Sequence, residues 1–176
     1  MVIESIKSEY QRYKSLAEMA ISQVKDTHLH QAFGEDNNSI AVVIKHIFGN
    51  LRSRFTNFLD EDGEKPWRER DKEFEEGFDS RTDLLRNWEE AWKILFDQLD
   101  SLEDPDLNKE VKIRNKGLPV CDALERSLAH VSYHVGQIVL MSRIHVGKDW
   151  KSLSIPRGKS QEYSLNPTKE RQPRTS

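Results

Sequence analysis

The sequence predicts an all-α protein, a four-helix bundle with up-down-down-up topology. Apolar residues recur at helical spacing in four segments, each of roughly 20–27 residues. Two of these segments begin with signals typical of helix N-termini. The connection between the second and third segments is long enough to span a bundle, which sets the relative directions of the helices.

The first and second helices are predicted from apolar stripes that would face a common core. The first stripe consists of Ile3, Ile6, Tyr10, Tyr13, Leu16, Ala20 and Val24. The second stripe consists of Ile40, Ile44, Ile47, Leu51, Phe55 and Phe58. Between them, residues 26–39 are polar and predict a loop, so we expect the two helices to be antiparallel.

The third and fourth helices have recognisable starting points. Ser80 with Asp83 resembles a capping box at the start of the third helix. Pro119 suits the first turn of the fourth helix. The third stripe consists of Leu85, Trp88, Trp92, Leu95, Leu99 and Leu102. The fourth consists of Leu124, Leu128, Val131, Val135, Ile138 and Ser142.

The connections indicate how the helices are ordered. The crossover at residues 60–79, with Gly63 and Pro66, is too long for a tight hairpin. At ~3.3 Å per residue it can run the ~30 Å length of a bundle and return the third helix parallel to the second. Alternating residues at 111–114, followed by a turn at 115–117, predict a short β-ribbon before the fourth helix. The fourth helix then runs antiparallel to the second.

Composition restricts the classes of function. A chain of 176 residues suits one bundle at residues 1–146 with a C-terminal extension at 147–176, which would pack on the bundle and end in ~10 disordered residues. Charged residues make up 32 %, but the net charge is only −3, so no basic field predicts nucleic-acid binding. No apolar run approaches the ~20 residues of a membrane span. Without an apolar signal core, and with a single cysteine, the chain is expected to be cytoplasmic.

His130 and His134 are the first candidate site residues. They stand four residues apart in the predicted fourth helix and therefore share one face. Two imidazoles at this spacing can reach one ion, because nitrogen–metal distances are ~2.0–2.1 Å. Alone, such a pair is also common among structural or exposed histidines.

A third histidine strengthens the interpretation. His46 stands one position before a stripe residue, just as His130 and His134 do. In antiparallel helices such flanks face each other, so three histidines are predicted around one point inside the bundle. Three neutral imidazoles with an open position are typical of a catalytic zinc site, although imidazole also suits nickel, iron and copper. His145, about 16 Å along the helix from His134, lies too far away.

These residues resemble a known superfamily. One histidine in the second helix, with the run His-x-x-x-His-x-Gly-Gln that starts at His130, is similar to the DinB-like (YfiT-like) bacterial metal-binding bundles. The resemblance covers about residues 1–146, and the runs at 62–68 and 158–163 resemble one branch. It implies the same helix order and metal ligands at His46, His130 and His134. The superfamily includes thiol S-transferases that use bacillithiol and a mycothiol-dependent isomerase.

Three further residues have two interpretations each. Gln137 lies on the histidine face, where it either orients a ligand or a metal-bound water or is a polar packing residue. Asn50, one turn beyond His46, is either a donor to the site or part of an interhelical hydrogen bond. Tyr133 either reaches the pocket or belongs to the core.

The C-terminal extension carries an excess of basic residues. One interpretation is a tail that packs on an acidic surface. The other places Arg157, Lys159 and Ser160 at the mouth of the pocket, where they would bind an anionic group of the substrate or cofactor.

We therefore expect an enzyme that acts on a small molecule with a divalent zinc, nickel or iron ion, of thiol S-transferase or hydrolase type. The resemblance implies a thiol such as bacillithiol. No acidic residue or further histidine is an evident general base, which favours thiolate transfer. The alternative is a non-catalytic, stress-associated bundle in which the ion only stiffens the core. The resemblance and the aromatic residues near the crossover indicate a homodimer: Phe55, Phe58, Trp67, Phe74 and Phe78.

Overall fold

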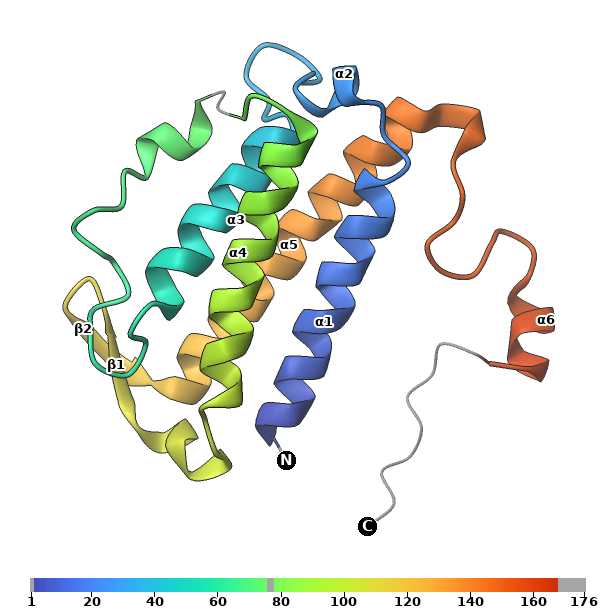
Figure 1. Cartoon of the computed structure of the whole chain (residues 1–176). Helices are drawn as coiled ribbons and strands as arrows, with labels where there is room; N and C mark the ends of the chain where they lie inside the picture. Colours follow the sequence, from blue (N-terminus) through green and yellow to red (C-terminus); the bar gives the residue numbers. More distant parts are fainter. Residues whose placement is uncertain (1, 76–77, 168–176) are drawn as a thin grey trace.

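The computed structural model describes residues 2–75 and 78–167 and is mostly helical (Figure 1). The long helices are α1 (Val2–Ile21), α3 (Ile40–Phe55), α4 (Arg81–Asp100) and α5 (Val120–Val146). The shorter elements are α2 (Asp26–Leu29), η1 (Asp71–Phe74), η2 (Asp104–Asn108), β1 (Glu110–Ile113), β2 (Lys116–Pro119), η3 (Gly147–Asp149) and α6 (Ser160–Leu165). The predicted all-α class is confirmed. In the described part of the chain, no helix has the length and apolar character of a membrane-spanning segment.

The four long helices lie side by side, and each contacts two of the others. α3 packs on α4 and α5, and α1 packs on α5 and α4. In Figure 1, α1 and α5 run upward from their N-termini, while α3 and α4 run downward. The helices α3 and α5, which carry His46, His130 and His134, are therefore antiparallel neighbours.

Helix starts agree with the sequence signals. The Ser39 hydroxyl accepts a hydrogen bond from the Val42 N–H at 3.2 Å, which caps α3. The Ser80 hydroxyl caps α4 in the same way, with 3.1 Å to the Asp83 N–H. Pro119 directly precedes α5. Each cap satisfies a backbone N–H that has no partner inside its helix.

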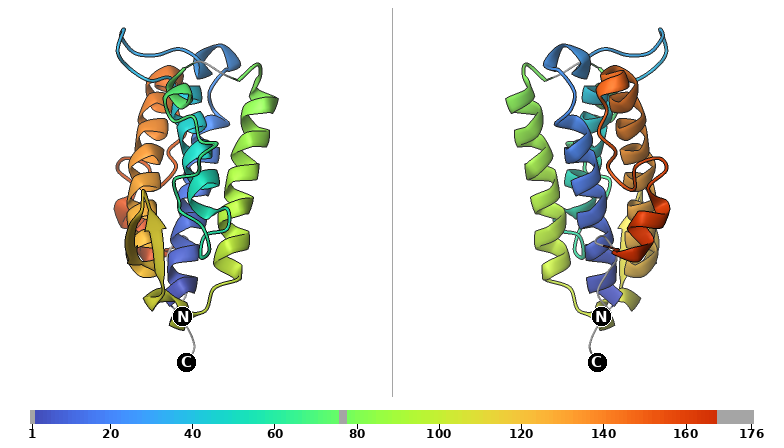
Figure 2. Two further views of the ribbon diagram at one scale, coloured as in Figure 1. Left: turned by 90° about the vertical axis from the view of Figure 1, so that its left-hand side faces the viewer. Right: turned by 90° about the vertical axis from the view of Figure 1, so that its right-hand side faces the viewer.

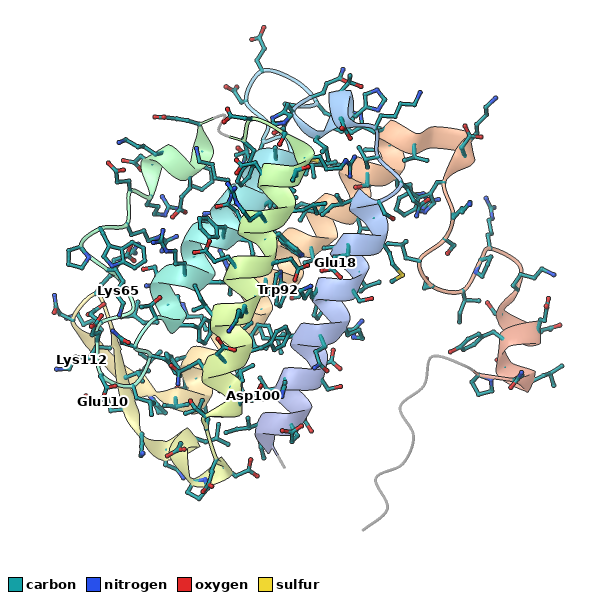
Figure 3. The ribbon with its side chains drawn as sticks, in the orientation of Figure 1. Glu18, Lys65, Trp92, Asp100, Glu110 and Lys112 are labelled. Carbon is teal, nitrogen blue, oxygen red and sulfur yellow. The ribbon has the colours of Figure 1, made fainter. Side chains whose placement is uncertain are left out.

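The core is centred on large aromatic side chains. Trp88 and Trp92 are fully buried on α4, and Figure 3 shows Trp92 among the packed helices. Tyr10 packs edge-on against Trp92, and its hydroxyl donates to the Leu124 carbonyl at 3.1 Å. Near the crossover, three aromatic residues are buried (Phe55, Phe58 and Phe78) and two are exposed (Trp67 and Phe74).

The connection from α3 to α4 runs along the outside of α3 and meets the β-hairpin (Figure 2, left). The Asp62 carboxylate accepts hydrogen bonds from the backbone N–H groups of Arg114 (2.9 Å) and Asn115 (2.6 Å). The Gly63 N–H donates to the Lys112 carbonyl at 2.8 Å. Arg114 and Asn115 have φ of +55° and +59°, as a two-residue hairpin turn requires. The predicted ribbon is present, and together with the crossover it forms one wall beside α3 and α5.

The C-terminal segment turns away from α5 at Gly147, where φ is +64°. The Gln23 side chain and the Lys151 backbone exchange two hydrogen bonds, of 3.1 and 2.8 Å. Farther along, α6 lies on the opposite side of the molecule from the hairpin (Figures 1 and 2). The final ~10 residues, for which the sequence predicts disorder, lie outside the described residues from 168 onward.

Candidate metal centre

Three histidine side chains meet between α3 and α5. The Nε2 atom of His130 lies 3.1 Å from Nε2 of His46 and 3.2 Å from Nε2 of His134. One ring nitrogen of each histidine lies within 4.8 Å of the other two. Nitrogens bound to one zinc ion at ~2.0–2.1 Å in tetrahedral geometry lie about 3.3 Å apart, so these three side chains can hold one ion.

The helix register brings the histidines together. Each histidine precedes a buried core residue of its own helix: Ile47, Val131 or Val135. His46 is almost fully buried, whereas His130 and His134 are half-buried. Because α3 and α5 are antiparallel, the flanks of the two apolar stripes face each other, and the clustering predicted from the sequence is confirmed.

A buried carboxylate from the crossover orients His46. Nδ1 of His46 donates to Glu73 Oε2 at 2.8 Å, and Arg68 donates to the two Glu73 oxygens at 2.7 and 2.9 Å. Burial alone raises the pKa of Glu73, but the hydrogen bonds from His46 and Arg68 outweigh it and lower that pKa. Glu73 is therefore an ionised acceptor. It holds the His46 proton on Nδ1 and turns the Nε2 lone pair toward the other histidines.

Gly49 makes room for this carboxylate. It lies on α3, close to one turn after His46. A Cβ atom at this position would lie 2.6 Å from the carboxyl carbon of Glu73 and 3.0 Å from its Cγ. A larger residue would therefore displace Glu73. Glycine inside a helix costs roughly 1 kcal/mol of stability relative to alanine. Gly49 therefore accommodates the Glu73 side chain at a cost to the stability of α3.

A side-chain amide orients His134. Nδ1 of His134 donates to Gln137 Oε1 at 2.8 Å, and Gln137 Nε2 donates to the Tyr133 hydroxyl at 3.3 Å. Tyr133 is 64 % exposed, so it is not a core residue. It reaches the cluster through Gln137 and through its own ring, which packs edge-on against the ring of His134 with centroids 5.0 Å apart. Asn50 lies on the other side, where it lines a cavity next to His46.

His130 stands between the other two histidines and differs from both. Its Nδ1 atom is buried and has no hydrogen-bond partner in the described structure. Burial, with smaller electrostatic contributions from His134, His46 and Arg68, lowers the pKa of His130 to about 3. Burial also lowers the pKa of His134. Neutral imidazoles whose lone pairs point to one place are the donor set that a divalent cation requires, and the residues present fit such an ion.

A cavity of about 220 Å³ adjoins His46 and His130. Its walls come from α3, α5, the crossover and the hairpin. Arg157, Lys159 and Ser160 do not line it. They belong to the exposed C-terminal segment, where Lys159 pairs with Glu162 at 2.7 Å.

Sequence reasoning did not find Glu73 and Arg68. A metal-binding histidine commonly donates its second N–H to a carboxylate, so some acidic partner is expected. The crossover contains many acidic residues, however, and neither spacing nor pattern distinguishes Glu73 among them. His145 lies outside the cluster, as its distance along the helix predicts, and its ring stacks on that of His28 with ring centroids 4.8 Å apart.

Comparison with protein families identifies the family of this chain. Residues 1–159 match the profile of a family described as "Protein of unknown function (DUF1572)". Comparisons with curated proteins and with solved structures found no match. The match to the family covers most of the chain and includes all three clustered histidines. The chain therefore belongs to the DUF1572 family.

Proposed function

We propose that this protein binds one divalent metal ion through His46, His130 and His134 and is a metal-dependent enzyme. The convergence of three imidazole nitrogens beside a cavity carries the proposal. A structural zinc site is usually closed by a fourth protein ligand, whereas a catalytic site keeps an open position. Among the described residues, no further histidine, cysteine or carboxylate joins the group of three.

The protein's own contribution is to hold the ligands in place. Glu73, itself fixed by Arg68, keeps His46 in the tautomer that exposes Nε2, and Gln137 does the same for His134. A zinc, nickel or iron ion held there would supply Lewis acidity and lower the pKa of a neighbouring water or thiol.

Within the enzyme classes, we favour thiol S-transfer over hydrolysis. None of the residues described as lining the cavity is a carboxylate, and Glu73 is committed to Arg68 and His46. A bound zinc ion lowers the pKa of water only to ~7, whereas it deprotonates a coordinated thiol outright. A site without a free general base therefore suits a thiol better.

A relationship to the DinB-like superfamily would also favour thiol S-transfer. The directions of the four long helices and the histidine pattern suit a DinB-like four-helix bundle with up-down-down-up topology. Such kinship would make a bacillithiol-type thiol the co-substrate. We also propose a homodimer, because α5 presents three exposed apolar side chains in one row: Tyr133, Leu140 and Ile144.

The test begins with elemental analysis of protein purified without added metal. We expect about one equivalent of a divalent metal, and turnover of bacillithiol with a generic electrophile that disappears on chelation and returns with metal. Turnover that persists after complete metal removal would rule out the mechanism. Stoichiometric metal without any turnover would favour the non-catalytic bundle.

A further inference from the structure

The cavity beside His46 and His130 is strongly cationic. Six basic side chains line it: Arg54, Arg68, Arg70, Lys112, Arg114 and Arg126. They come from α3, the crossover, the hairpin and α5, which are far apart in the sequence. Figure 3 shows Lys112 on the hairpin side of the molecule, away from α6. Among the described residues that line the cavity, none is an aspartate or a glutamate.

Two carboxylates compensate only part of this charge. Glu64 is shared by three guanidinium groups: those of Arg54 (3.1 Å), Arg114 (3.1 Å) and Arg68 (3.5 Å). Glu73 pairs with Arg68 and with the ring of His46. Within the described part of the chain, no ion pair involves Lys112, Arg126 or Arg70. The cavity therefore keeps an excess of positive charge.

The basic groups also act on one another. Burial, together with the neighbouring charges of Arg68 and Arg114, lowers the pKa of Arg54 although Glu64 opposes the shift. Guanidinium groups nevertheless stay charged at neutral pH, so their mutual repulsion persists. An anion placed among them would relieve this repulsion and gain charge-assisted hydrogen bonds.

Two of the uncompensated cations are well placed to hold such an anion. Arg126 stands four residues before His130 and shares its face of α5, and Lys112 extends from β1. Phe55, Phe58 and Ala123 supply an apolar part of the wall. We propose that this cavity binds the anionic end, a carboxylate or a phosphate, of a small-molecule substrate, with Arg126 and Lys112 as its recognition residues.

The inference rests on the proposed function in one respect: the bound molecule would present its reactive end to the histidine cluster. Recognition of the anion itself does not need the metal. The two proposals can therefore fail separately, and the experiment uses the full chain without metal.

The test is a titration of the metal-free full chain with inorganic phosphate and with succinate at low salt, followed by backbone NMR shifts. We expect saturable binding of at least one anion, with shifts near Lys112, Arg126 and His130. Arg126→Gln or Lys112→Gln should weaken binding about tenfold or more, because each removes a charged hydrogen-bond donor. Whichever anion binds more tightly identifies the headgroup.

A matched control lies on the same helix. Arg143→Gln makes the same charge change in the last turn of α5, outside the cavity, and should alter binding by less than about twofold. Equal weakening in Arg143→Gln would overturn the inference, because it would reflect net charge alone. Lack of saturable binding of both anions, or equal binding of neutral succinamide, would also overturn it. Intact anion binding in a chain that takes up no metal would leave this inference standing and remove the proposed function.

Discussion

Replacement of Glu73 with Gln tests how the site is built. The amide keeps the size of the side chain and one acceptor for His46, but it removes the charge. Arg68, whose side chain is 2 % exposed, would then retain only Glu64 at 3.5 Å. Removing one partner of a buried ion pair costs about 3–5 kcal/mol. Glu64 offsets part of this, so we expect a loss of about 2–3 kcal/mol and, at about 2–4 °C per kcal/mol, a fall in Tm of about 4–12 °C.

The same substitution should weaken metal binding about 10–100-fold, because Glu73 orients His46 without touching the ion. Competition with a chromophoric chelator measures the affinity, and circular dichroism of the metal-free protein gives Tm. Glu69→Gln is the matched control, since Glu69 lies in the same crossover but is exposed and pairs only with Lys72 in the described structure. If the two variants bind metal within twofold of each other, Glu73 does not position His46 and the reasoning is wrong.

Three further predictions follow from the cluster. His46→Ala should reduce metal affinity at least about tenfold, whereas His145→Ala, outside the cluster, should retain it; equal retention in calorimetry would contradict the ligand assignment. Gly49→Ala should weaken metal binding by displacing Glu73. Gly136→Ala, whose Cβ meets nothing within 4 Å, should keep the metal affinity and stabilise α5 by up to ~1 kcal/mol. Chelator competition measures the metal affinity of the two variants, and thermal denaturation measures their stability. Because the folded-state pKa of His130 is lowered to about 3, the unfolded chain binds a proton that the folded chain does not. The free energy of unfolding of the metal-free protein should therefore decrease as pH falls below ~6.5. Urea titrations at pH 7 and pH 5 should show a smaller decrease for His130→Gln than for the wild type, and an equal decrease in the two proteins would refute this origin.

The histidine cluster could be predicted because helix geometry is local and periodic. Once His46 and His134 are placed on the flanks of apolar stripes, antiparallel packing of the two helices is enough to bring them together. The partner of His46 could not be predicted in this way. Glu73 reaches the cluster from an irregular connection, whose path depends on single contacts such as that of Asp62 with the hairpin turn. Such contacts leave no periodic signal in the sequence.

The basic lining of the cavity illustrates the same limit. The C-terminal segment carries an excess of positive charge in the sequence, and for this reason Arg157, Lys159 and Ser160 were the expected anion-binding residues. In the folded chain, Arg126 and Lys112 reach one cavity from two separate elements, α5 and β1. Their charges lie beside each other only after the hairpin has packed against α5.

The crossover therefore has a role beyond joining two parallel helices. At its start, Asp62 and Gly63 bind the hairpin; at its centre, Arg68 pairs with both Glu64 and Glu73. The residues that close the cavity and the residues that orient His46 are thus members of one chain of contacts. No hairpin residue is a candidate ligand. A shift of the hairpin would nevertheless move Glu64 and Arg68, and through Arg68 it would move Glu73, which orients His46. This linkage gives a physical reason for burying charged side chains in a connection that could otherwise be an exposed loop.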